Sequence, residues 1–143
     1  GRFVAASGGE TVPCSDWLYV IFPSLLFACA YQPRDHGLEI GYTWLGREFQ
    51  RTAVNTEAKY LLLENAFDVI GAHRVELKTD LRNLRSQKAI ERLGAQKEGV
   101  LRRHMVTQGG YVRDSVCYSI TDLDWPRVRV PLAAKLQDNN TLH

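Results

Sequence analysis

The sequence has few cysteines, and its charge is close to balanced. Its 143 residues include only three cysteines, Cys14, Cys29 and Cys117. This odd number, with no metal-ligand spacing, argues against a disulfide framework and a cysteine-based metal centre. We therefore expect no metal and a reducing, cytoplasmic location. We also expect no secretory signal, because no apolar run lies behind a basic segment that leads to a small-residue cleavage site.

The sequence also lacks an apolar run long enough to cross a membrane. Its longest uncharged apolar stretch covers residues 17–30 and is divided by Pro23 and Ser24, whereas a membrane-spanning helix needs about 20 residues. Aromatic and β-branched residues favour strands here, so we predict a hairpin of residues 16–22 and 25–31. We expect no membrane partner. The apolar hairpin and an exposed sheet edge instead make a homodimer the expected assembly.

The small positive charge does not by itself predict a nucleic-acid partner. The net charge is +2, but residues 72–113 hold ten Lys and Arg against four Asp and Glu. Such an excess could meet the phosphates of a nucleotide cofactor, an acidic acceptor or RNA, or it could form a solvated helix face. A basic RNA-associated module is the weakest of these interpretations, and we expect no nucleic-acid partner.

Two helices are predicted from apolar residues at helical spacing. The first covers residues 55–70, with Asn55 or Thr56 as its cap, and Gly71 ends it. The second covers residues 86–93 and ends at Gly94.

Strands precede, separate and follow these helices. We predict them over residues 38–45, 74–79, 99–107 and 111–121, the last two as a hairpin. Val75 and Leu77 should share one face of their strand. A short helix starts at Asp124, and a polar tail follows over residues 137–143. The order predicts an α+β fold, with one mixed sheet and packed helices, as a single domain over residues 1–143.

A short loop leads directly into the helix of residues 55–70. Unpaired N–H groups and the helix dipole favour an anion at such a point. We interpret the amides from about Arg51 to Asn55 as a pyrophosphate site, and the alternative is an ordinary loop that caps a helix. The strand of residues 74–79 leads similarly to Asn83 and Ser86.

Taken in order, these motifs resemble the GNAT superfamily of acetyl-CoA-dependent N-acetyltransferases, and within it the branch that contains the ribosomal-protein Nα-acetyltransferases. The resemblance covers residues 38–125 and is carried by residues 38–45, the loop, and residues 83–99. It implies a GNAT-like fold, acetyl-CoA as co-substrate, and direct acetyl transfer to the primary amine of a peptide N-terminus or a small molecule. Residues 1–37 do not match the family's usual first strand and two helices, so we expect this fold without them.

The resemblance also implies which residues hold the cofactor. In the family, the backbone of Tyr42–Leu45 would pair with the pantetheine arm, and Asn83 and Ser86 would lie near the arm and the thioester. Ala53 stands where the family usually carries glycine. The implied cofactor-binding residues are Trp44, Leu45, Gln50, Arg51, Thr52, Ala53, Val54, Asn55, Asn83 and Ser86.

Acetyl transfer to an amine needs a base for the amine proton and a donor near the leaving sulfur. Glu39 occupies a position where related enzymes place a base that acts through water, and His104 is a second candidate because histidine titrates near neutral pH. Ser86 and Tyr118 are candidate acids. Each has a structural alternative as a surface carboxylate, a polar turn residue, a helix-start residue or a core aromatic.

A different function remains open at this point. Many relatives carry a tyrosine four residues after the serine position, and this chain has Ile90 there. Together with Ala53 and the short N-terminal part, Ile90 supports the alternative of a shortened GNAT-fold protein that binds CoA or a partner without turnover.

Overall fold

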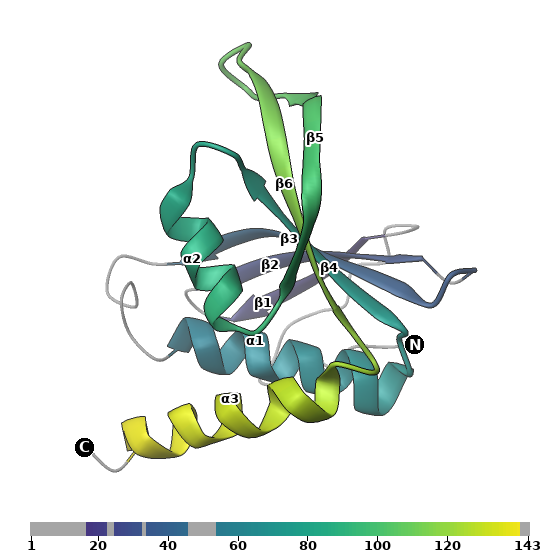
Figure 1. The fold of residues 1–143 in the computed structure, drawn as a ribbon, viewed down its shortest axis with the longest axis vertical. Coiled ribbons are helices and arrows are strands. Elements are labelled where there is room, and N and C mark those ends of the chain that lie inside the picture. The colour runs from purple at the N-terminus through teal and green to yellow at the C-terminus, as the bar shows by residue number, and fades with distance from the viewer. Residues whose placement is uncertain (1–16, 23–24, 33, 46–53, 141–143) are drawn as a thin grey trace.

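The computed structural model describes residues 17–22, 25–32, 34–45 and 54–140. Its described strands form one six-stranded sheet in the order β1-β2-β3-β4-β6-β5 (Figure 1). Neighbouring strands are antiparallel except β3 and β4, which are parallel. The predicted mixed sheet is therefore confirmed. The strands are β1 Trp17–Phe22, β2 Leu25–Gln32, β3 Gly37–Leu45, β4 Arg74–Asp80, β5 Gln96–Val106 and β6 Val112–Thr121.

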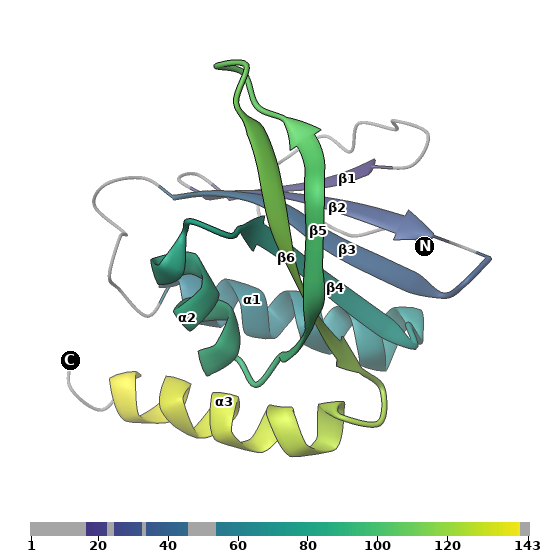
Figure 2. The same cartoon turned by 45° about the horizontal axis from the view of Figure 1, so that its top comes forward.

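The described helices cover one face of this sheet (Figure 2). They are α1 Val54–Glu64, which continues into the π-helical turn η2 Asn65–Ile70, then α2 Leu84–Arg92 and α3 Trp125–Asn140. The order of strands and helices along the chain is the predicted one. The hairpin at the start is also confirmed, with Trp17 opposite Ala30 and Phe22 opposite Leu25.

One continuous core lies between the helices and the sheet. In β4, Val75 and Leu77 are buried while their neighbours are partly exposed, as the alternating pattern predicts. The same face of β6 contributes Val116, Tyr118 and Ile120. The remaining core side chains are Leu38, Ile40, Ala58, Leu62, Leu63, Ala66, Ala72, Ile90, Leu93, Trp125, Val128 and Leu132.

The first helix differs from the prediction at its start. It begins at Val54, so Asn55 and Thr56 lie inside its first turn and neither occupies the capping position. Its end agrees with the prediction, because Gly71 adopts a φ of 73° and its N–H donates to the carbonyl of Ala66. A left-handed residue of this kind closes the last turn, and glycine adopts that conformation without a Cβ penalty.

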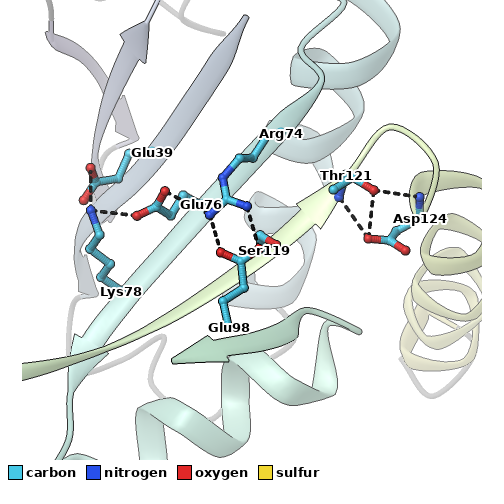
Figure 3. Close-up of polar contacts among 8 residues, drawn as sticks. All are labelled: Glu39, Arg74, Glu76, Lys78, Glu98, Ser119, Thr121 and Asp124. Carbon is cyan, nitrogen blue, oxygen red and sulfur yellow. Dashed lines mark hydrogen bonds and ion pairs between the residues drawn. The ribbon is translucent and has the colours of Figure 1, made fainter. Parts of the chain in front are cut away.

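The last helix is longer than predicted. It continues to Asn140, so residues 137–140 of the expected polar tail are helical. Its start is joined to β6 by a reciprocal contact, in which the Oδ2 atom of Asp124 accepts from the N–H and hydroxyl of Thr121, and the N–H of Asp124 donates back to that hydroxyl (Figure 3). Pro126 is the second residue of the helix, where no helical N–H bond is needed.

Gly94 joins α2 to β5 and is expected to be sensitive to substitution. Its φ is 93°, and a Cβ atom there would lie 3.1 Å from Cγ2 of Val128 on α3. We expect Gly94→Ala to lower the free energy of unfolding by about 1–2 kcal/mol, from backbone strain and crowding together. Urea denaturation measures this value. Gly109→Ala is the matched control, because no atom lies within 4 Å of its Cβ position, and a loss as large for Gly109→Ala would contradict the explanation.

Candidate functional site

The central feature of the candidate site is a separation of the two parallel strands. Backbone pairing between β3 and β4 runs from Gly37 opposite Arg74 to Ile40 opposite Leu77 and ends there. Beyond this point β3 stays paired with β2 as far as Leu45, and β4 stays paired with β6 as far as Asp80. The facing backbone groups of the two strand ends are therefore left without each other as partners. An extended ligand can take their place.

Two helices begin next to this opening. The carboxyl ends of β3 and β4 lead towards the N-termini of α1 and α2, respectively (Figure 1). Sites in sheets with parallel strands commonly lie at such carboxyl ends, and helix N-termini favour anions.

Asn83 caps α2 as predicted. Its side-chain Oδ1 accepts from the N–H of Ser86 at 3.0 Å. The cap uses only the oxygen, and among the described residues no group accepts a hydrogen bond from its amide Nδ2. Gln87 fixes the same turn, because its Nε2 donates to the carbonyls of Leu81 at 2.8 Å and Asp80 at 3.3 Å.

The structure describes some of the other predicted cofactor residues and not others. Trp44 and Leu45 lie in the end of β3 that does not pair with β4, Val54 and Asn55 begin α1, and Ser86 lies in the first turn of α2. Gln50, Arg51, Thr52 and Ala53 lie outside the described residues. The Oδ1 atom of Asn55 is buried and has no hydrogen-bond partner, which among the described residues is true of no other buried side-chain oxygen or nitrogen. The described ends of both segments thus retain polar groups that fit a hydrogen-bonding ligand.

The sheet face opposite the helices carries a ladder of charged side chains (Figure 3). At one end, Nζ of Lys78 on β4 lies 3.3 Å from Glu39 of β3 and 2.7 Å from Glu76. Arg74 continues the ladder from Glu76, at 3.1 Å, to Glu98 of β5. Ser119 also donates to Glu98, at 2.7 Å. Glu39 is therefore paired with a cation and is only partly exposed.

The hydroxyl of Tyr118 faces the helices, on the other side of the sheet from Glu39. Its side chain is fully buried and donates to Oε1 of Glu91 on α2 at 2.9 Å. Burial, together with this carboxylate, raises the pKa of Tyr118 to about 12. The hydroxyl therefore keeps its proton at neutral pH and holds α2 against β6.

His104 lies in an irregular part of β5. The register between β5 and β6 shifts between Leu101 and Met105. Nδ1 of His104 lies 2.9 Å from Oγ of Ser115, and Arg113 donates to the same oxygen at 2.8 Å. A serine oxygen has two acceptor lone pairs and one proton, so Ser115 can accept from Arg113 and still either donate to Nδ1 of His104 or accept from it.

The structure does not gather the four predicted catalytic residues into one cluster. Glu39 lies in the charged ladder, Tyr118 is bonded to Glu91, and His104 is bonded to Ser115. Ser86 lies at the start of α2 beside the strand opening. Burial, and next to it Glu76, raise the pKa of the Cys117 thiol, which lowers its reactive thiolate fraction.

Two buried polar residues were not selected from the sequence. Gln87 and Lys59 are polar side chains with only 8% and 9% of their surface exposed. Gln87 is explained by its bonds to the end of β4. The available signal for Lys59 was its helical spacing from Leu62, Leu63 and Ala66, which are all buried.

Neither a metal site nor a membrane span is found in the part of the chain that the structure describes. No group of three or more His, Cys, Asp or Glu side chains there is arranged to hold a metal ion. None of the described helices combines the length and the apolar character needed to cross a membrane.

Comparison with known proteins gives concordant matches. Residues 26–96 match the family described as "Acetyltransferase (GNAT) domain". The chain is 32% identical over 87 residues to the "Putative ribosomal N-acetyltransferase YdaF" of Bacillus subtilis. This match covers 61% of this chain and 46% of that protein. The chain thus spans less than half the length of this curated relative.

Solved structures agree with the fold. A "putative acetyltransferase" from T. thermophilus is 45% identical with a TM-score of 0.74, and the match covers 79% of this chain and 60% of that one. A GCN5-related N-acetyltransferase from Brucella melitensis is 31% identical with a TM-score of 0.76, and the match covers 83% and 57%.

The charged ladder predicts a specific acid dependence of stability. The hydrogen bonds from Arg74, followed by the one from Ser119, lower the pKa of Glu98 to about 2. A carboxyl whose pKa is lower in the folded state stabilises the fold above its unfolded pKa of about 4.3, and this contribution is lost as the pH falls towards about 2. We expect Glu98→Gln to make the free energy of unfolding less dependent on pH in this window, as measured by urea denaturation.

The control for this prediction is Asp35→Asn, in the exposed turn before β3. It removes one acidic group outside the ladder and should retain the steep wild-type dependence. Because the Glu98 side chain is 39% exposed, solvent screening keeps the effect small. Parallel curves for the wild type and Glu98→Gln would contradict the assignment.

Proposed function

The chain belongs to the GNAT superfamily, and on that premise we propose that it transfers an acetyl group from acetyl-CoA to a primary amine, either a peptide N-terminus or a small molecule. The observation that carries this proposal is the loss of pairing between β3 and β4 after Ile40 and Leu77. A paired sheet would offer no backbone groups at this place. The separated strands offer an extended row of them beside two helix N-termini.

The residues around the opening fit the cofactor. The end of β3 beyond Ile40 would receive the amide groups of the pantetheine arm. Nδ2 of Asn83 can donate to the arm while Oδ1 keeps its capping bond to Ser86. The N–H groups of the first turn of α1 would face the pyrophosphate, and the unsatisfied Oδ1 of Asn55 would accept from a hydroxyl or amino group of the cofactor.

Bound acetyl-CoA would supply the acetyl thioester, and the chain would supply a base and a positive environment for the leaving sulfur. Glu39 is the proposed base, acting on the amine through water from the sheet face that carries the ladder. Lys78, 3.3 Å away, holds its carboxylate in place. The N-terminus of α2 and the hydroxyl of Ser86 would stabilise the negative charge that develops on the sulfur.

Tyr118 and His104 have supporting positions in this proposal. The hydroxyl of Tyr118 is buried against Glu91, and Nδ1 of His104 is bonded to Ser115. Both side chains stabilise the fold where they lie. The commonest acid of the family is replaced by the core residue Ile90, which is 3% exposed, so the proposed donor is Ser86.

Asn83→Asp separates the capping role of this residue from its proposed binding role. Aspartate keeps the oxygen that accepts from Ser86 and suits a helix N-terminus, but it loses the amide donor. We expect the free energy of unfolding to stay within about 0.5 kcal/mol of the wild type. Calorimetric titration should show about tenfold weaker binding of acetyl-CoA. Unchanged affinity would show that Asn83 caps α2 but does not bind the cofactor.

Glu39→Gln tests the proposed base. We expect kcat to fall by about 10²- to 10⁴-fold with little change in calorimetric affinity for acetyl-CoA, measured as release of free thiol over a panel of amines. Glu98→Gln, at the other end of the same ladder, is the control and should retain activity. Equal activity of Glu39→Gln and wild type would remove Glu39 from the mechanism, and wild-type binding without thiol release on any amine would favour a non-catalytic CoA-binding protein.

A further inference from the structure

Lys59 is the described lysine whose environment differs most from that of an ordinary surface lysine. It lies in α1, and only 9% of its surface is exposed. Lysine is almost never buried to this extent unless its charge is paired. Within the described part of the chain, Lys59 has neither an ion pair nor a hydrogen bond. Its ammonium is not among the fully buried unsatisfied atoms, so the stem is covered while the nitrogen keeps a small opening to solvent.

The charge near Lys59 has the same sign. Burial, and next to it the guanidinium of Arg92, lower the pKa of the Lys59 ammonium. Arg92 lies in the last turn of α2, and its main-chain carbonyl accepts from Nζ of Lys135 on α3 at 3.4 Å. The side chains of Lys59 and Arg92 thus place two positive charges near each other, and Lys135 lies at the main chain of Arg92. An arrangement of this kind is stabilised when an anion joins it.

A second unsatisfied group lies one turn before Lys59. Asn55 and Lys59 are four residues apart in α1, so their side chains occupy the same side of the helix. The Oδ1 atom of Asn55 is buried and has no hydrogen-bond partner. The unsatisfied acceptor of Asn55 and the desolvated cation of Lys59 therefore lie in successive turns near the N-terminus of α1, a helix of 11 residues. Lys59 needs an acceptor and Oδ1 of Asn55 needs a donor, and the described residues supply neither.

We propose that Lys59, with Arg92 beside it, forms an anion subsite that binds a phosphate group of the cofactor. This inference rests on the proposed function, because acetyl-CoA is the phosphate-bearing molecule that the site would hold. Lys59 is then a binding residue that compensates charge one turn beyond the N-terminal amides of α1. In the absence of cofactor the protein keeps this cation desolvated and beside a like charge.

The experiment compares wild-type protein with Lys59→Met. Methionine keeps the packing of the aliphatic stem and removes the charge. Lys97→Met, on β5, is the control, since it removes one exposed lysine charge far along the chain from α1. Calorimetric titrations with CoA, with dephospho-CoA, which lacks the 3′-phosphate, and with pantetheine, which lacks every phosphate, measure the affinity of each protein for each probe. Thermal melting without ligand checks that each variant is folded.

We expect Lys59→Met to bind CoA about 10- to 100-fold more weakly than wild type, the range of one charge-assisted hydrogen bond. Its affinity for pantetheine should be unchanged, and Lys97→Met should match wild type with all three probes. A loss seen with both CoA and dephospho-CoA assigns the contact to the pyrophosphate, whereas a loss seen with CoA alone assigns it to the 3′-phosphate. The ligand-free Lys59→Met protein should melt at or above the wild-type temperature, because a desolvated charge has been removed.

Two results would overturn the inference. One is equal affinity of wild type and Lys59→Met for CoA, and the other is an equal loss for CoA and pantetheine, which would give Lys59 a role unrelated to phosphate. If the wild type itself binds no CoA, the proposed function fails first, and this result is distinct from both of the others.

Discussion

The arrangement of the site depends on one constraint in the sheet, which is that β3 can pair with β4 only at its beginning. The two strands are hydrogen-bonded from Gly37 and Arg74 to Ile40 and Leu77. Beyond these residues β3 pairs only with β2, after a register shift between Phe27 and Cys29, and β4 pairs only with β6. Unpaired backbone groups are costly unless water or a ligand satisfies them. The opening is nevertheless maintained, because β2 and β6 hold the two strand ends apart.

The two faces of the sheet carry different kinds of side chain. The face beneath α1, α2 and α3 holds the apolar core, and the hydroxyl of Tyr118 on that face is used to attach α2. The opposite face carries the ladder from Glu39 to Glu98. In the proposed function, an amine that approaches from the ladder face would reach the opening from the side opposite the helices that would hold the cofactor. The two substrates would then approach from different sides of the sheet.

Local sequence patterns predicted the order of the helices and strands. Features that depend on tertiary packing, such as the strand opening, could not be derived from those patterns. Alternation identified the buried face of β4, and Asn83 identified the start of α2, since both signals are local. The length of α3 was missed because its last residues, 137–140, are polar and carry no apolar periodicity, although the core residues Trp125, Val128 and Leu132 anchor its first half. The separation of β3 from β4 came only from family resemblance. Backbone hydrogen bonds between strands do not require particular side chains, so the sequence of a strand does not show where its pairing ends.

Lys59, the proposed phosphate-binding residue, could not be selected from the sequence. Helical spacing assigns its position to the buried side of α1, and a lysine there looks like an ordinary exception to the apolar pattern. Only the folded chain shows that its stem is covered and that its nearest charge is Arg92. Groups that weaken the empty fold are retained where a ligand compensates them. Asn55 and Lys59 lie on one side of one helix, so a ligand with both an anionic group and a hydrogen-bond donor could satisfy both.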